Sequence, residues 1–217
     1  MVVFDYRRAI KLQKILSSKV ISSVTSSSRI DCDQIRFVAG LDAAYHKGVT
    51  YGVAVLIDLR TRSLIKHSIV SKKTTIPYVP GLLAFREAPS CIAALLKLGH
   101  KPDLIVVDGH GLTHPRGLGI ASHVGLVLDT PSIGVAKKRL YGEERNEDGE
   151  TYIYVHGVKA GKIIVHRGRK LYVSIGYRIR LDDAVRIIES LLDPKYKLPL
   201  PTALADMISK RAAHRRK

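Results

Sequence analysis

The sequence predicts an α/β fold in which helices flank a mixed central sheet. Three apolar, β-branched runs stand close together at residues 35–44, 51–59 and 63–71. Helical and strand-like patterns then alternate along the chain. The 217 residues contain no linker that would divide them and are enough for one full hydrophobic core. We therefore expect a single domain over residues 1–217.

The N-terminal part predicts one helix and an antiparallel meander. Apolar residues recur near a 3.6-residue period over residues 5–16, as in a helix packed on the domain. A serine-rich connection is expected at residues 17–28. The three apolar runs that follow are separated by turn-like residues such as Lys47 and Gly48, which favours hairpins between neighbouring strands.

The middle of the chain alternates helix and strand. Helical spacing starts at Leu82 and ends near Gly99, and a continuous apolar run at 103–108 reads as a buried parallel strand. A helix at 119–128 and a strand at 132–136 come next. Three strands followed by helix, strand, helix and strand is the order of a ribonuclease H-like fold. Strands at 151–157, 161–166 and 170–176 and helices at 182–192 and 201–213 complete the chain.

The composition indicates a polyanionic partner and an intracellular setting. The chain has 36 Lys and Arg against 19 Asp and Glu, a formal net charge of +17, which favours nucleic acid over a purely solubilising role. Two cysteines cannot form a disulfide framework, and no Cys/His spacing matches a zinc site. Neither a signal peptide nor a membrane-spanning run is evident, so a cytoplasmic protein that binds no membrane is expected.

Three carboxylates stand where an ion would gather them. Asp42 and Asp108 each follow an apolar strand-like run, and Glu87 lies in the helix that connects those strands. Like charges in one cleft repel unless a cation neutralises them, and carboxylates without Cys ligands suit Mg²⁺, for which Mn²⁺ would substitute. Any one of these acids alone is more often a helix cap or half of an ion pair.

One tyrosine is held between prolines. Pro77 and Pro80 stiffen the segment around Tyr78 because the proline ring fixes φ. A stiff aromatic side chain can enter a base stack and lower the cost of extruding a nucleotide. An ordinary turn with a half-buried tyrosine is the alternative.

A glycine-rich loop follows Asp108 and ends where the next helix begins. It has glycines at 109, 111, 117 and 119, and lacks the spacing of known phosphate loops, so main-chain recognition of a flipped base fits it better. His114 in this loop could donate a proton or hold a water, or be a surface residue. Lys137, after an apolar run, suits a phosphate, and is otherwise a strand-end lysine.

Four segments together closely resemble endonuclease V over residues 25–215: FVAGLDAAY at 37–45, PYVPGLLAFRE at 77–87, DGHGLTHPRGLGIASHVG at 108–125 and IGVAKKRL at 133–140. The resemblance implies Asp42, Glu87 and Asp108 as catalytic metal ligands, with Asp206 near the metal. It implies His114 and Lys137 as catalytic or phosphate-contacting groups and Tyr78 as the wedge. The substrate-binding residues that it implies are Pro77, Pro80, Gly81, Leu83, Gly109, Gly111, Gly119, Ile120 and Ala136.

The family's activity is an expectation for this chain. It is hydrolysis of the second phosphodiester bond 3′ to deoxyinosine in DNA repair, leaving 3′-hydroxyl and 5′-phosphate ends, by a monomer. His110 stands where some relatives have Gln, and Tyr177 replaces a common His. An inosine-specific endoribonuclease of the same fold, a noncatalytic protein that binds damaged DNA, and a junction nuclease remain alternatives.

Overall fold

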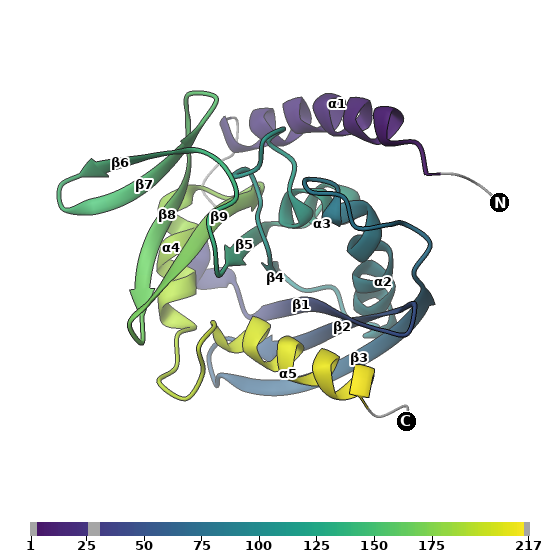
Figure 1. Cartoon of the computed structure of the whole chain (residues 1–217). Coiled ribbons are helices and arrows are strands. Elements are labelled where there is room, and N and C mark those ends of the chain that lie inside the picture. The colour runs from purple at the N-terminus through teal and green to yellow at the C-terminus, as the bar shows by residue number, and fades with distance from the viewer. Residues whose placement is uncertain (1–3, 26–30, 215–217) are drawn as a thin grey trace.

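The computed structural model describes residues 4–25 and 31–214, and its helices surround one large sheet (Figure 1). The helices are α1 (Tyr6–Thr25), the short 3₁₀ helix η1 (Cys32–Gln34), α2 (Leu83–Lys97), α3 (Ile120–Leu128), α4 (Leu181–Ser190) and α5 (Leu200–His214). The strands are β1 (Phe37–His46), β2 (Val49–Asp58), β3 (Ser63–Lys73), β4 (Leu104–Asp108), β5 (Ser132–Ala136), β6 (Glu143–Glu147), β7 (Glu150–Val155), β8 (Val158–His166) and β9 (Arg169–Tyr177).

The sheet confirms the predicted ribonuclease H-like order. Its nine strands run β3-β2-β1-β4-β5-β9-β8-β7-β6. The first three strands form the expected antiparallel meander, and β1, β4 and β5 are parallel neighbours. Parallel strands need long crossovers, and α2 and α3 provide them. The carboxyl ends of β4 and β5 therefore lie at the same edge of the sheet, beside β1.

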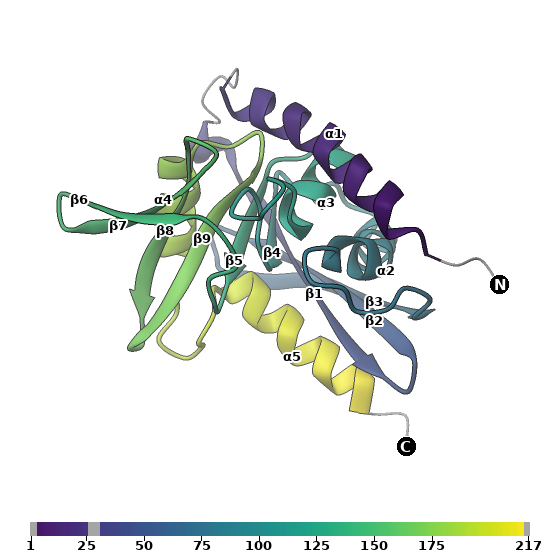
Figure 2. The same cartoon turned by 45° about the horizontal axis from the view of Figure 1, so that its top comes forward.

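Helices cover both faces of the sheet (Figures 1 and 2). Along β2, Ala54 and Leu56 pack with residues of α2, whereas Val53 and Val55 pack with α5. This alternation follows from the two-residue period of a strand. A polar residue in β1 or β4 can thus face α5 while its neighbours in sequence are buried against α2.

The N-terminal helix is longer than predicted. The serine-rich segment from residue 17 was expected to be a connection, but α1 continues to Thr25; residues 26–28 of that segment lie outside the described residues. Ser17 and Ser18 donate their hydroxyls to the carbonyls of Lys14 and Ile15, three residues back, at 2.9 and 2.8 Å. Such bonds satisfy serine inside a helix. Burial of Val20 against the core supplies the packing that the serines do not.

A hairpin also includes a strand that was absent from the predicted elements. The acidic stretch from Glu143 to Glu150 contains β6, which pairs with β7 at the end of the sheet (Figure 1). Asp148 and Gly149 connect the two strands with φ of 50° and 81°. An Asp-Gly pair with positive φ is a preferred two-residue hairpin turn. That dipeptide was the signal for the strand that sequence analysis missed.

None of the helices in the described ranges is long and apolar enough to cross a membrane.

Candidate active site

Asp42 and Asp108 lie side by side at one edge of the sheet. In the parallel pairing of β1 with β4, Leu41 stands opposite Val107, so the next positions are the two aspartates. Neighbouring strands are about 4.8 Å apart, which brings the carboxylates close together. Burial raises the pKa of Asp42 to about 6, and the charge of Asp108 adds to that rise.

Lys137 joins Asp108 to Asp206 of α5. Its Nζ lies 2.6 Å from Asp108 Oδ2 and 3.4 Å from Asp206 Oδ1. Burial lowers the pKa of Lys137, but the two aspartates outweigh this effect and raise it above its ordinary value. Lys137 therefore carries a positive charge at neutral pH and partly neutralises the aspartates.

Residues of α5 complete this side of the site. Ser209 Oγ donates to Asp42 Oδ2 at 2.6 Å, and Lys210 Nζ lies 2.6 Å from Asp206 Oδ2. Positions 206, 209 and 210 share one helix face because they are three and four residues apart. Neither Ser209 nor Lys210 was predicted to belong to the site, and only the packing of α5 on β1 brings them there.

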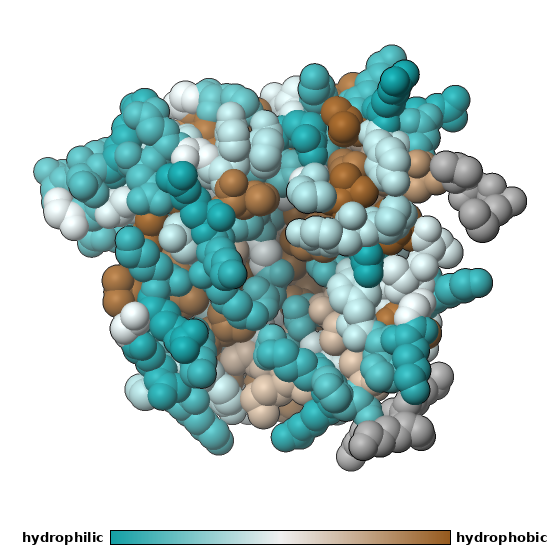
Figure 3. All heavy atoms as spheres, viewed as in Figure 1, coloured by the Kyte–Doolittle hydropathy of each residue, from teal (hydrophilic) through white to brown (hydrophobic). Residues whose placement is uncertain are grey.

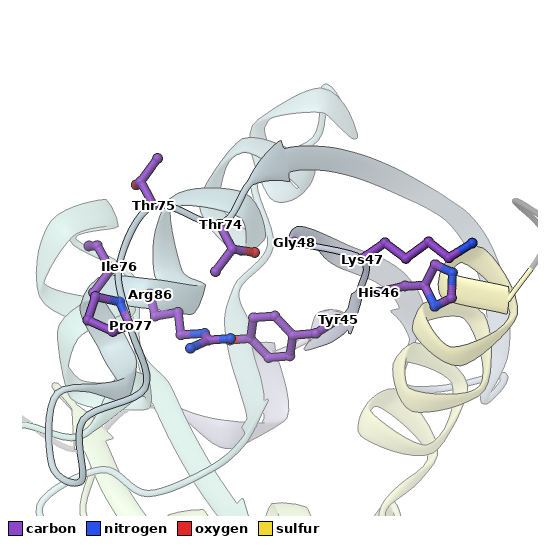
Figure 4. Close-up of a pocket in the computed structure, with 9 residues that line it drawn as sticks. All are labelled: Tyr45, His46, Lys47, Gly48, Thr74, Thr75, Ile76, Pro77 and Arg86. Atoms are coloured by element: carbon purple, nitrogen blue, oxygen red, sulfur yellow. The ribbon is translucent and has the colours of Figure 1, made fainter. Parts of the chain in front are cut away.

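Glu87 approaches from α2, on the other face of the sheet. Burial raises its pKa to about 7, and Asp42 and Asp108 add to the rise, so the three acids share one electrostatic environment. Tyr45 Oη donates to Glu87 Oε1 at 2.8 Å, and the Arg86 guanidinium lies 4.3 Å from the Tyr45 ring centroid. Figure 4 shows Arg86 and Tyr45 pointing toward one another. Both residues line a cleft of about 470 Å³.

The three carboxylates suit a hard cation, although their side-chain rotamers are not arranged to coordinate one. Within residues 4–25 and 31–214, no three His, Cys, Asp or Glu side chains are arranged to hold a metal ion. Asp108 instead pairs with Lys137, Asp42 accepts from Ser209, and Glu87 accepts from Tyr45. Carboxylates are nevertheless the ligands that Mg²⁺ and Mn²⁺ prefer, and a cation would offset the repulsion among them. The ligand set stays a prediction.

A hollow of about 320 Å³ lies beside the carboxylates. It contains seven of the predicted substrate or catalytic residues: Tyr78, Gly81, Leu83, Gly109, His114, Gly119 and Ile120. Gln13, His110, Lys138, Arg139 and Leu140 also line it. Tyr78 is 66% exposed at its mouth. We call this hollow the base pocket.

Four predicted substrate residues lie outside the lining of the base pocket. Pro77 lines the cleft beside Arg86, while Pro80, Gly111 and Ala136 line neither hollow. Ala136 is buried as the last residue of β5. Of the two departures from the family pattern, His110 lines the pocket, whereas Tyr177 donates to Asp129 at 3.1 Å instead.

The glycines of the loop let the backbone close on itself. A Cβ at Gly119 would collide with the carbonyl of His110, and one at Gly111 would collide with the carbonyl of Ile175. Gly111 thus has a packing role behind the pocket. These close approaches explain why the loop needs glycine even where no substrate is in contact.

His114 is buried and holds the loop to the segment before α2. Its Nδ1 accepts from the Arg116 backbone N–H at 3.1 Å, so its Nε2 carries the proton and donates to the Gly81 carbonyl at 3.0 Å. Burial lowers the pKa of His114 to about 4, and the nearby Arg116 adds to this effect. The imidazole is therefore neutral at neutral pH, with both ring nitrogens engaged.

Gln13 of α1 is a pocket residue that sequence analysis missed. Its fully buried amide donates to the carbonyls of Gly81 and Leu118 at 2.9 and 3.2 Å and accepts from Arg116 Nε at 2.6 Å. A glutamine on the apolar face of the helix, between Ala9 and Val20, was the available signal. The amide can be buried there because its hydrogen bonds are satisfied.

Comparison with known proteins places this geometry in one family. The profile of the Endonuclease V family matches residues 17–207. An endonuclease V of Desulfurococcus amylolyticus is 54% identical over 208 residues, which cover 95% of each chain. The crystal structure of endonuclease V from Streptomyces avermitilis has a TM-score of 0.84 at 32% identity, covering 97% of this chain and 93% of that one.

A structure from Ciona intestinalis has the same fold. Ciona intestinalis endonuclease V, in complex with a 24mer DNA containing an inosine followed by a ribo-adenosine, has a TM-score of 0.82 at 23% identity, covering 95% of this chain and 97% of that one. The profile match and the identity to the Desulfurococcus protein carry the assignment. The chain belongs to the endonuclease V family and is an endonuclease.

Proposed function

We propose that the chain is a metal-dependent endonuclease that recognises deoxyinosine in DNA and hydrolyses the second phosphodiester bond 3′ to it. The observation that carries the proposal is the base pocket next to the carboxylates of two adjacent strands. Its volume of about 320 Å³ lies at the small end of ligand pockets. The Ciona relative in complex with inosine-containing DNA supports the choice of lesion.

Asp42, Glu87 and Asp108 would hold the ion, with Asp206 beside them. When bound, a divalent ion supplies a hydroxide near neutral pH and stabilises the charge that develops on the phosphate. To bind the ion, Asp108 would lose its hydrogen bond with Lys137, and Glu87 would lose its hydrogen bond with Tyr45. Mg²⁺ is the proposed metal, and Mn²⁺ would replace it.

Lys137 and Tyr78 prepare the substrate. Once released from Asp108, the Lys137 ammonium lies at the end of β5 with its charge available for a phosphate oxygen. Tyr78, exposed between two prolines, fills the space that an extruded base leaves in the stack.

His114 positions the pocket wall. Both ring nitrogens are hydrogen-bonded, and the N–H at Nε2 donates to the Gly81 carbonyl. In this geometry His114 therefore does not donate a proton to a leaving group. A water molecule would then have to protonate the departing 3′ oxygen. Loss of His114 would displace Gly81 and with it the pocket.

One assay tests the proposal. A duplex with a single deoxyinosine is incubated with Mg²⁺, with Mn²⁺ and with EDTA, and the cut is mapped by the length and end groups of the products. We expect one nick at the second phosphodiester 3′ to the lesion, with 3′-hydroxyl and 5′-phosphate ends, and none in EDTA. Equal cutting of the unmodified duplex, or cutting in EDTA, would refute it.

RNA is the second candidate substrate, because the DNA bound to the Ciona relative has a ribo-adenosine after the inosine. Paired DNA and RNA oligonucleotides with one inosine decide between the two. Membership of an endonuclease family sets aside a noncatalytic damage-binding protein. A lesion-free four-way junction, included in the same assay, tests the junction nuclease and should remain intact.

A further inference from the structure

A second hollow, of about 570 Å³, lies beyond Lys137 and Asp206. Four separate segments line it: the loop after β5, the start of β9, the loop before α5, and α5 itself. Seven of its eleven lining residues are Lys or Arg, and Asp206 is its single acid. In Figure 3, hydrophilic side chains gather where the β8–β9 hairpin approaches α5. We call this hollow the basic groove.

Four cations of the groove have no acid to neutralise them. Lys138, Arg169, Lys170 and Lys197 are exposed and form no ion pair with any residue of the described ranges. The other three are Lys137, Arg139 and Lys210, each paired with an acid. Free cations gathered on one concave surface repel one another unless a polyanion lies among them.

The basic groove adjoins the base pocket and reaches the carboxylates through Lys137. Lys138 and Arg139 line both hollows, and Lys137, which contacts Asp108, lines the groove. The base pocket includes residues of α2 and α3, whereas the groove is built on α5 and β9. A strand with its base in the pocket can therefore enter the groove past Lys137, at the ends of β4 and β5.

We infer that the basic groove binds the sugar-phosphate backbone of the cleaved strand on the 3′ side of the cut. The inference rests on the proposed function for its polarity: the bond cut is 3′ to the base in the pocket, so the chain beyond the carboxylates is the 3′ segment. Arg169, Lys170 and Lys197 bind its phosphates, and the half-buried Tyr172 offers a ring beside them. The groove carries no sequence preference, because phosphate contacts position a strand without reading bases.

A charge-matched pair of triple variants tests the groove. Arg169→Ala/Lys170→Ala/Lys197→Ala removes three of its free cations. Arg60→Ala/Lys101→Ala/Arg180→Ala removes three exposed cations that flank β2, β4 and β9 at the opposite edge of the sheet. None of the six is placed in the carboxylate site or the base pocket. Circular dichroism and thermal melts check that both variants are folded.

Binding is measured by fluorescence anisotropy in EDTA over a range of salt concentrations. The probes are a deoxyinosine strand with long flanks on both sides, one that ends a nucleotide beyond the proposed cut, and one truncated on the 5′ side instead. On the long probe, the slope of log affinity against log salt should become shallower by about two to three for the groove variant. The control variant should keep the wild-type slope.

The probe lengths decide the polarity. The groove variant should lose affinity for the long and the 5′-truncated probes, and bind the 3′-truncated probe as tightly as the wild type. Equal loss on every probe, or an unchanged salt slope, overturns the inference. Because these measurements report binding, they test the groove independently of cleavage. If the wild type fails to cut inosine-containing DNA, that result refutes the proposed function and leaves the test of the groove intact.

Discussion

Gln13 donates its side-chain amide to the carbonyl oxygen of Gly81 across 2.9 Å, and so fastens the N-terminal helix to the segment that begins α2. The same carbonyl also accepts from Arg116 Nη2 at 2.7 Å and from His114 Nε2 at 3.0 Å. Three donors from two distant parts of the chain therefore meet on one pocket residue. The pocket wall is held by side chains from outside the carboxylate site.

Replacing Gln13 should loosen this wall. Gln13→Leu keeps the volume but leaves Arg116 Nε and the Leu118 carbonyl without their partner, at a cost of about 1–3 kcal/mol in unfolding free energy. Discrimination between inosine and adenosine should fall as well. Urea unfolding and the ratio of kcat/KM for the two strands measure these effects. Gln34→Leu, at an exposed glutamine, is the matched control, and an equal effect there would refute the role of Gln13.

Removing either strand carboxylate should abolish cutting. Asp42→Ala or Asp108→Ala deletes a proposed ligand, and we expect a loss of at least about 100-fold in single-turnover rate, with affinity for the inosine strand largely kept. Asp33→Ala, at an exposed aspartate in η1, controls for the change of charge. Full activity in either strand variant would exclude the proposed site.

Asp206 allows a finer test of the metal. Since it pairs with Lys137 and Lys210 at the margin of the site, Asp206→Asn should raise the Mg²⁺ concentration needed for half-maximal cutting more than it lowers the maximal rate. A titration of Mg²⁺ at saturating substrate separates the two effects. An unchanged titration midpoint would remove Asp206 from the metal environment.

Tyr78 should matter for duplexes more than for single strands. Tyr78→Ala removes the ring that replaces the extruded base, and unstacking costs a few kcal/mol, so duplex cutting should fall by about 10- to 100-fold while single-strand cutting falls less. Because the side chain is 66% exposed, thermal stability should be unaffected. Tyr78→Phe keeps the ring and should retain activity. Equal losses on both substrates would argue against a wedge.

The lowered pKa of His114 should make the folded state less stable in acid. Its pKa of about 4 in the folded chain lies below its ordinary value of 6.5, so the unfolded chain takes up the proton first as the pH falls. Stability is then complete above about pH 6.5 and is lost as the pH falls toward 4, by at most roughly 3 kcal/mol from this group. Urea unfolding of wild type and His114→Gln across this range should show the difference between them shrinking.

The exposed His67→Gln gives the baseline for that series. If the wild type and His114→Gln lose stability in parallel as the pH falls, His114 is not the group responsible.

Local patterns predicted most of the elements because burial imposes a period on the chain. The apolar run before Asp108 predicted β4, and the alternation of helix and strand predicted the order of the sheet. The predictions failed where a short segment was compatible with more than one structure. The serines of α1 bond within their own helix while Val20 packs on the core, and Asp148 with Gly149 turns an acidic stretch into the β6–β7 hairpin.

Local sequence patterns predicted the candidate active site only in part. Asp42 and Asp108 could be placed together because both end apolar runs in parallel strands, and strand neighbours follow from order. Gln13, Ser209 and Tyr45 could not, since each reaches the site through packing of an element whose angle and rotation no local pattern reveals.

By itself, the sequence determined the fold class, the basic character, the carboxylates that follow apolar runs and the tyrosine between prolines, because charge, apolar period and proline geometry are properties of short segments. Only the tertiary structure decided that α5 supplies Ser209 and Asp206, that Gln13 and His114 share the Gly81 carbonyl, and that a basic groove adjoins the base pocket. These are contacts between residues far apart in the chain. They arise from how the helices pack on the sheet, which depends on all the buried surfaces together.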